Sequence, residues 1–341
     1  MVERTIFDTG LLPAPLRFDA WRDSIGVVLD VDESRARAPE AFDVRVDTWM
    51  LDGLVFSRCA APSQAFSRSL DKMAGDGIDH YMVQLFLKGG VEMRRGRGAV
   101  TAGAGAIVGF DMADVLDSLN SDFDLLTIFI PRRRLAPMLN RPDSIHGQVV
   151  GGETGAGRLL ADAYRSVHAM ADTFTPAEAA VAADMLLRLI AAAMNGAAAP
   201  ERDPPDWADQ ALTLKARRFA AANLADPSLT PDLIAAALGV SRARLYRAFA
   251  GTGGVQAMVR GMRLRRAFAD LVSPRLRGLQ ISEIAWRSGF SDPAHFTRLF
   301  RDHYGVSPRE ARARGAAALA ARRAGPGGLD RRYEDWITAI A

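Results

Sequence analysis

Residues 281–310 read ISEIAWRSGFSDPAHFTRLFRDHYGVSPRE, and their pattern indicates the architecture of the C-terminal third of the chain. Ile284 belongs to the inner face of a first short helix, and Gly289 follows at the point where that helix would end. Phe296 and Phe300 are four residues apart, so they share one face of a second helix. Two short helices joined by a glycine turn, each with an apolar face, predict a helix-turn-helix unit.

A second, less regular copy of this pattern precedes it. The earlier copy has Ile234-Ala235, Gly239, Leu245-x-Arg247-x-Phe249 and Gly254-Val255, which match Ile284-Ala285, Gly289, Phe296-x-Arg298-x-Phe300 and Gly305-Val306. Thr230 before Pro231 is expected to cap its first helix, and the turn glycines are expected at positive φ. Ser241, and either Ser291 or Asp292, are expected to cap the helices after the turns. One chain would therefore present two recognition helices to DNA.

Residues 215–314 resemble the DNA-binding domain of the AraC/XylS transcriptional regulators, and the second unit carries the denser match. Where such proteins often have proline after the Gly-Val pair, this chain has Gln256-Ala257. The resemblance implies base contacts at Ala243, Tyr246, Arg247, Ala294, His295 and Arg298. Together with Arg242 and Thr297, which also face outward on these helices, they form the expected base-reading set.

Contacts to DNA phosphates are expected beside the recognition helices and on a connecting helix over residues 255–271. The candidates are Ser241, Arg260, Arg263, Arg266 and Arg301. For at least one arginine of the connecting helix, a solvated surface charge is the favoured interpretation. The two recognition helices are expected to enter successive major grooves on one face of the DNA, ~34 Å apart.

The charge distribution also indicates polyanion binding by the C-terminal part. From Lys215 to the end, the chain has 22 Lys and Arg against 10 Asp and Glu, a net charge of +12. The first 214 residues have 21 against 30, a net charge of −9, and the whole-chain value of +3 hides this split. A basic segment joined to an acidic one is typical of a nucleic-acid-binding module. A GC-rich genome explains the preference for arginine over lysine, but it does not explain the difference in net charge between the two parts of the chain.

Length and composition limit the class of protein. The 341 residues suffice for two or three domains, and no apolar run approaches the ~20 residues of a membrane span. The N-terminus shows no hydrophobic leader, and the single Cys59 excludes an intramolecular disulfide. A buried, inert thiol is the favoured interpretation of Cys59. These features predict a cytoplasmic, nucleoid-associated protein without a membrane segment.

Residues 1–150 are expected to form a β-rich domain. Six segments have the apolar, partly alternating pattern of strands: 42–50, 53–59, 81–88, 91–95, 106–110 and 125–131. Gly89-Gly90 between two of them predicts a hairpin. Short, closely spaced strands predict a barrel or sandwich, and beside the C-terminal match they resemble the cupin-like sensor domain of such regulators. Residues 13–34 are expected to be partly helical, with Phe18, Trp21 and Ile25 on one face.

The mouth of this barrel is the expected effector pocket. The candidates to line it are Trp49, Phe56, Tyr81, Phe86, Arg94 and Phe110, each of which is more often a core or surface residue than a ligand contact. Arg94 or Arg95 would pair with an effector carboxylate, or else remain a solvated edge charge. Metal-dependent cupins use clustered histidines, whereas the histidines of this region are isolated in the sequence. No metal, cofactor or catalytic residue is therefore expected, and the protein is not predicted to be an enzyme.

Residues 151–196 predict a helical hairpin after the β-rich domain. Its apolar stripe is the expected dimer face, with packing against the barrel as the alternative. The candidates for this face are Leu160, Tyr164, Leu186, Leu189 and Ile190. Residues 197–210 are a Pro- and Ala-rich linker, 211–315 the DNA-binding domain, and 316–341 a tail without an assigned role.

The predicted fold class is α+β and multidomain: a cupin-like β-barrel with a helical hairpin, then an all-α tandem helix-turn-helix domain. The predicted function is a sequence-specific transcription regulator, an activator that responds to a small-molecule effector. Expected partners are double-stranded promoter DNA, the effector, RNA polymerase and a second copy of the chain. An effector-independent architectural DNA-binding protein is one alternative, and a cupin enzyme fused to DNA-binding helices is another. The dissimilar recognition helices argue against the first, since a sequence-blind protein needs no distinct base-reading faces.

Overall fold

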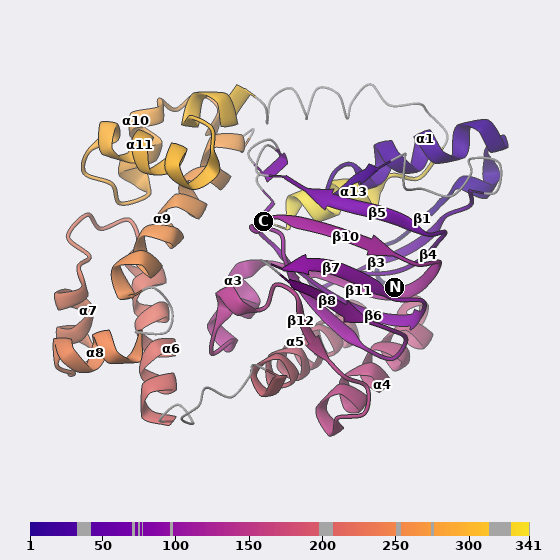
Figure 1. Ribbon diagram of the computed structural model, residues 1–341, viewed down its shortest axis with the longest axis horizontal. Helices are drawn as coiled ribbons and strands as arrows, with labels where there is room; N and C mark the ends of the chain where they lie inside the picture. Colours follow the sequence, from indigo (N-terminus) through magenta and orange to yellow (C-terminus); the bar gives the residue numbers. More distant parts are fainter. Residues whose placement is uncertain are drawn as a thin grey trace.

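Two antiparallel sheets pack face to face in the N-terminal domain (Figure 1). The structure, a computed structural model, describes residues 1–32, 42–69, 72–73, 76, 78–95, 98–197, 207–249, 254–273, 276–313 and 329–340. The first sheet has the strand order β1-β3-β4-β11-β6-β9-β12. Its strands are β1 (Arg4–Asp8), β3 (Arg45–Leu51), β4 (Leu54–Ala61), β6 (Tyr81–Lys88), β9 (Ile107–Asp111), β11 (Phe123–Ile130) and β12 (Gln148–Val150).

The second sheet has the strand order β2-β5-β10-β7-β8. Its strands are β2 (Asp30–Asp32), β5 (Gln64–Arg68), β7 (Val91–Arg95), β8 (Gly98–Ala102) and β10 (Leu116–Asn120). All six strands expected from the sequence are present, with ends shifted by a few residues. Among the described residues, every strand pairing stays within one sheet, so the domain is a two-sheet sandwich instead of the expected closed barrel.

The hairpin predicted at Gly89-Gly90 is wrong. Strand β6 pairs with β9 and β11 in the first sheet, whereas β7 pairs with β8 and β10 in the second. Gly89 has a φ of +72°, and a Cβ on it would collide with the backbone carbonyl oxygen of Asp122. The glycine pair is therefore needed where the chain crosses tightly from one sheet to the other.

Two helices cover the outer face of the first sheet. These are α4 (Gly155–Met170) and α5 (Pro176–Ala197), joined by the short helix η6 (Ala171–Thr173), and they confirm the expected helical hairpin. The stripe formed by Leu160, Tyr164, Leu186 and Ile190 is completely buried against this sheet. These four residues therefore pack within their own chain, which was the alternative to a dimer face. They are not available to contact a second copy.

The core between the sheets is closed by helices from opposite ends of the chain. Helix α1 (Ala14–Ile25), after the short helix η1 (Thr9–Leu11), contributes Phe18 and Trp21, which lie on one face as expected. Helix α13 (Arg332–Ala339) contributes Tyr333 and Ile337 to the same core. Figure 1 shows α13, in yellow, beside α1 and away from α10 and α11. The C-terminal segment thus belongs to the N-terminal domain in space.

The C-terminal domain is entirely helical and has two small cores. Its helices are α6 (Trp207–Ala222), α7 (Pro231–Ala237), α8 (Arg242–Ala248), α9 (Val255–Val272), α10 (Ile281–Arg287) and α11 (Pro293–Tyr304). The first half of α9 packs with α6, α7 and α8, and its second half packs with α10 and α11. Helix α9 therefore links two helix-turn-helix units, as the sequence predicts.

Short helices α3 (Arg132–Leu135), η4 (Ala136–Met138) and η5 (Pro142–Ser144) lie between β11 and β12, where the N-terminal domain meets α6. The greater part of the expected linker and the start of the expected tail lie outside the described residues. Among the helices that the structure describes, none combines the length and apolar character needed to span a bilayer.

Candidate DNA interface and effector cavity

The first recognition helix, α8, begins at the cap that the sequence predicts. The side chain of Ser241 accepts a hydrogen bond from the backbone N–H of Arg244 at 3.2 Å. Burial of Leu245 and Phe249 turns the opposite face outward, so that Arg242, Ala243 and Arg247 are exposed. Tyr246 is half-buried, and the guanidinium carbon of Arg242 lies 5.3 Å from the centre of its ring.

The second recognition helix, α11, is capped by Asp292, whose carboxylate accepts a hydrogen bond from Ala294 N–H at 2.8 Å. This resolves the alternative between Ser291 and Asp292. Phe296 and Phe300 are fully buried. The outward residues, all exposed, are Ala294, His295, Thr297, Arg298 and Arg301. The hydroxyl of Thr297 donates to the backbone carbonyl of Pro293, so the helix itself holds it.

The turn glycines set the angle between the helices of each unit. Gly239 and Gly289 have φ values of +66° and +87°, as expected. A Cβ at Gly289 would also collide with the backbone carbonyl oxygen of Leu224, which follows the end of α6. A substitution there would displace the second unit, because both backbone conformation and space require glycine.

The three arginines predicted to meet phosphates from α9 have different surroundings. Arg260 is exposed. Arg263 donates hydrogen bonds to the backbone carbonyls of Leu224 and Asp226, and burial lowers its pKa, so its geometry indicates a structural role. Arg266 is exposed but lines a cavity between the two domains.

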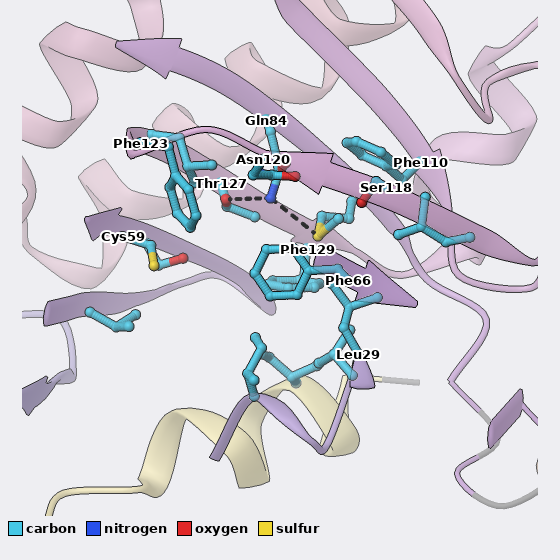
Figure 2. A pocket seen from close by; sticks show the side chains of 18 of the residues that line it. Leu29, Cys59, Phe66, Gln84, Phe110, Ser118, Asn120, Phe123, Thr127 and Phe129 are labelled. Carbon is cyan, nitrogen blue, oxygen red and sulfur yellow. Dashed lines mark hydrogen bonds between the residues drawn. The ribbon is translucent and has the colours of Figure 1, made fainter. Parts of the chain in front are cut away.

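A narrow cavity lies between the two sheets of the N-terminal domain (Figure 2). Its volume is about 60 Å³, which leaves space for only a few water molecules. Most of its wall is apolar, formed by residues that include Leu29, Phe66, Phe110, Phe123 and Phe129. Polar side chains interrupt this wall on both sheets: Ser57, Gln84 and Thr127 on the first, Ser118 and Asn120 on the second. An apolar cavity with a few polar groups is typical of a small-molecule site.

Gln84 is a polar residue of this wall whose side chain contacts two of its neighbours there. Its amide nitrogen donates to the hydroxyl of Thr127 at 3.3 Å, beside which it lies in Figure 2. The same nitrogen lies 3.6 Å from the sulfur of Met82. Cys59 also lines the cavity, and burial raises the pKa of its thiol to about 12. The thiol therefore stays protonated near neutral pH, in agreement with the inert interpretation of the sequence.

The C-terminal helix α13 supplies part of the cavity wall through Tyr333 and Ile337. Its contacts with the N-terminal domain are polar as well as apolar. The hydroxyl of Ser24 meets Tyr333 and Glu334, and the backbone carbonyl of Ile337 lies 2.7 Å from His80 Nε2. The sequence alone assigns no role to this tail. The helical spacing of Tyr333, Ile337 and Ile340 was a signal for a buried face, but not for where the helix docks.

Of the six side chains predicted to line the effector pocket, the structure brings only Phe110 to the cavity. Trp49, Phe56 and Tyr81 point to the other face of the first sheet, into the core with α4 and α5. Phe86 is buried between the sheets but does not contact the cavity. Arg94 is 81% exposed and forms an ion pair with Asp117 at 3.4 Å. The register of each strand decides these positions, because a shift of one residue reverses every side chain.

The histidines of the N-terminal domain have separate surroundings. His80 contacts α13, His146 Nδ1 accepts a hydrogen bond from the backbone N–H of Asp111, and His168 packs edge-on against Trp49. Within the described residues, no group of three or more His, Cys, Asp and Glu side chains is arranged to hold a metal ion. The N-terminal domain thus has a cavity between its sheets, and the C-terminal domain has two exposed helical faces.

Comparisons with known proteins agree with this division. Residues 21–195 match the AraC-binding-like domain family, and residues 234–314 match a helix-turn-helix domain family. The transcriptional activator NphR of Rhodococcus sp. is 27% identical over 256 residues, which cover 74% of this chain and 75% of NphR. An uncharacterized protein in the nit 5′ region of Bacillus sp. (strain OxB-1) is 24% identical over 242 residues, which cover 69% of this chain and 92% of that protein.

The fold also has a counterpart among solved structures. The crystal structure of the AraC-like transcriptional activator CuxR superposes with a TM-score of 0.56 and 24% identity, over 84% of this chain and all of that chain. The two-domain arrangement, with a cupin-like sandwich before paired helix-turn-helix units, is therefore confirmed.

Proposed function

This chain belongs to the AraC family of DNA-binding transcription regulators, and we propose that it activates transcription when a small molecule occupies the cavity between its two sheets. The observation that carries the proposal is the pair of exposed recognition helices, each with an exposed arginine: Arg247 in the last turn of α8 and Arg298 in the middle of α11. The similarity to the activator NphR supports activation as the direction of the response.

The exposed faces of α8 and α11 favour unequal base reading by the two units. Arg247 and Arg298 have the planar, two-pronged donor geometry that matches guanine in the major groove. The base-reading residues proposed for α8 are Arg242, Ala243, Tyr246 and Arg247, and those for α11 are Ala294, His295, Thr297 and Arg298. Ala243 offers only a methyl contact, and Arg242 also lies 3.3 Å from Asp232. We therefore expect fewer specific hydrogen bonds from the first unit.

The cavity between the sheets is the proposed effector site. Its present volume of about 60 Å³ is smaller than most organic ligands, so binding requires its wall to move. Helix α13 is the element of this wall that is joined to the C-terminal domain by the intervening chain. An effector that displaces α13 would therefore pull on the chain that connects α13 to the DNA-binding helices before it.

A homodimer is proposed through the outer face of α4 and α5. A groove on this face exposes apolar side chains, among them Leu159 at 59%, Val181 at 71% and Met185 at 39%. Leu189, which is only partly buried, also lines the groove, unlike the other four residues first expected there. Exposed apolar patches that are continuous along two helices are typical of protein–protein interfaces. A second copy would pair two sets of recognition helices on DNA.

RNA polymerase is the proposed partner at the promoter, and the cytoplasm is the proposed location because the target is DNA. Selection of bound sequences from a random pool of double-stranded DNA tests the function directly. The full chain should enrich one motif with two half-sites, and Arg298→Ala should lose the preference in one of them. A pool that binds without enrichment would support the architectural alternative instead.

A further inference from the structure

A second cavity, of about 560 Å³, lies between the two domains and is unusually rich in arginine. Its volume falls within the range of about 300–1,000 Å³ that small organic ligands occupy. Six arginines line it: Arg132 and Arg133 from α3, Arg217 and Arg218 from α6, and Arg265 and Arg266 from α9. Asp79 is its one acidic lining residue among the described part of the chain.

Carboxylates neutralise only the inner arginines of this cavity. Arg132 is paired with Asp111 and Asp79, while Arg217 and Arg265 share Asp143, at 3.3 and 3.9 Å. Burial disfavours ionisation of Asp143, but the charges of Arg265, Arg217 and Arg132 outweigh it and lower its pKa. Asp143 therefore stays charged and joins the two domains.

The outer arginines form no ion pair with a carboxylate in the described structure, although the charge of Arg266 counteracts the burial that raises the pKa of Asp270. Arg133 donates to the backbone carbonyl of Ile340 at 3.0 Å, and Arg218 to that of Pro137 at 3.3 Å. Arg218 and Arg266 are exposed at the rim. The cavity thus keeps an excess of positive charge, which attracts anions because its protein walls concentrate the field.

One buried donor inside this cluster is also unused. Arg217 is 7% exposed, and its Nε is buried without a hydrogen-bond partner in the described structure. Burial is the main cause that lowers the pKa of Arg217, with the nearby charge of Arg265 acting in the same direction. A buried guanidinium this close to the charge of Arg265 is destabilised by their repulsion, and a bound anion would offset part of it.

We propose that this interdomain cavity binds a small organic anion with two or more phosphate or carboxylate groups. The guanidinium groups of α3, α6 and α9 would hold its charges from both domains. Its carbon skeleton would lie against the apolar part of the wall, which includes Pro142, Leu224 and Met262. Such an anion stabilises the observed arrangement of the two domains, since it bridges them. This site is separate from the cavity between the sheets and does not depend on an effector there.

Calorimetric titration of the full chain with pyrophosphate and with citrate, at constant ionic strength, tests the site. At least one anion should bind saturably and raise the melting temperature. Pyrophosphate alone would indicate a phosphate ligand, citrate alone a carboxylate ligand, and both a general oxyanion site. Absence of saturable binding by either anion up to about 10 mM, a range in which a charged pocket should respond, would overturn the proposal.

Matched variants separate a built site from general attraction to a basic protein. Arg218→Ala with Arg266→Ala removes two exposed donors and should weaken binding about tenfold or more. Arg158→Ala with Arg309→Ala removes two exposed arginines elsewhere and should leave it unchanged. Arg133→Ala, on the side of the N-terminal domain, should also weaken binding. Equal effects of both double variants, or no effect of Arg133→Ala, would contradict a bridging site, and circular dichroism verifies that each variant folds.

Discussion

His80 of the N-terminal domain and Ile337 of the C-terminal helix meet at 2.7 Å, between Nε2 of the histidine and the backbone carbonyl oxygen of the isoleucine. Because the carbonyl can only accept, Nε2 carries the proton. Residues 257 positions apart in the chain thereby share one buried hydrogen bond. The contact fixes α13 on the domain whose cavity it helps to close.

Ile337→Ala should destabilise the N-terminal domain by about 2–5 kcal/mol, because it removes a buried side chain and enlarges the cavity. Urea unfolding measured by circular dichroism gives the change in the free energy of unfolding. Asp335→Ala, on the exposed side of the same helix, should change stability by less than about 0.5 kcal/mol. Equal stability of the two variants would mean that α13 is not docked as described.

Acidification should loosen α13. Burial lowers the pKa of His80 below its ordinary value of 6.5, although Asp79 and the Ile337 carbonyl act in the opposite direction. Below pH 6.5 the unfolded chain therefore takes up a proton more readily than the folded one, and stability falls as the pH decreases toward the folded pKa. His80→Gln keeps a donor but does not titrate, so its melting temperature should fall less between pH 7.5 and 5.5. Parallel curves for both proteins would show that His80 does not contribute.

The dimer proposal predicts different effects for substitutions at neighbouring residues of α5. Val181→Glu with Met185→Glu should give folded monomers, because the charges replace exposed apolar side chains in the groove. Leu186→Glu should instead prevent folding, since Leu186 is fully buried against the sheet. Sedimentation velocity with circular dichroism distinguishes these results. Val115→Glu, at another exposed apolar position, is the control and should leave the dimer intact. A Val181/Met185 variant that stays dimeric would place the interface elsewhere.

The sequence predicts the C-terminal domain in detail because its signals are local. Thr230, Ser241 and Asp292 cap helices, Gly239 and Gly289 take positive φ, and the apolar pairs four residues apart are buried. Each of these properties depends on a few neighbouring residues, so a single sequence is enough to predict them.

The fold of the N-terminal domain is harder to predict from the sequence, because its contacts join residues that are far apart in the chain. Strands such as β5 and β10 are short and lack strong alternation, and the crossing at Gly89-Gly90 has the same residues as a hairpin turn. The apolar stripe of α5 is equally compatible with a sheet or a second chain. Only the three-dimensional arrangement shows that Leu186 faces the sheet and Val181 faces outward, and that residues 329–340 return to α1.

Hydroxyl-radical footprinting of the full chain on its selected operator shows directly whether α8 and α11 read adjacent major grooves. Each protomer should protect two tracts on one face of the DNA, ~34 Å apart. Arg298→Ala should lose contacts in one tract, with a loss of ~1–3 kcal/mol at one base pair, and Arg247→Ala should lose contacts in the other. A single protected tract per protomer, or a uniform loss of affinity with both variants, would show that α8 and α11 do not read separate grooves.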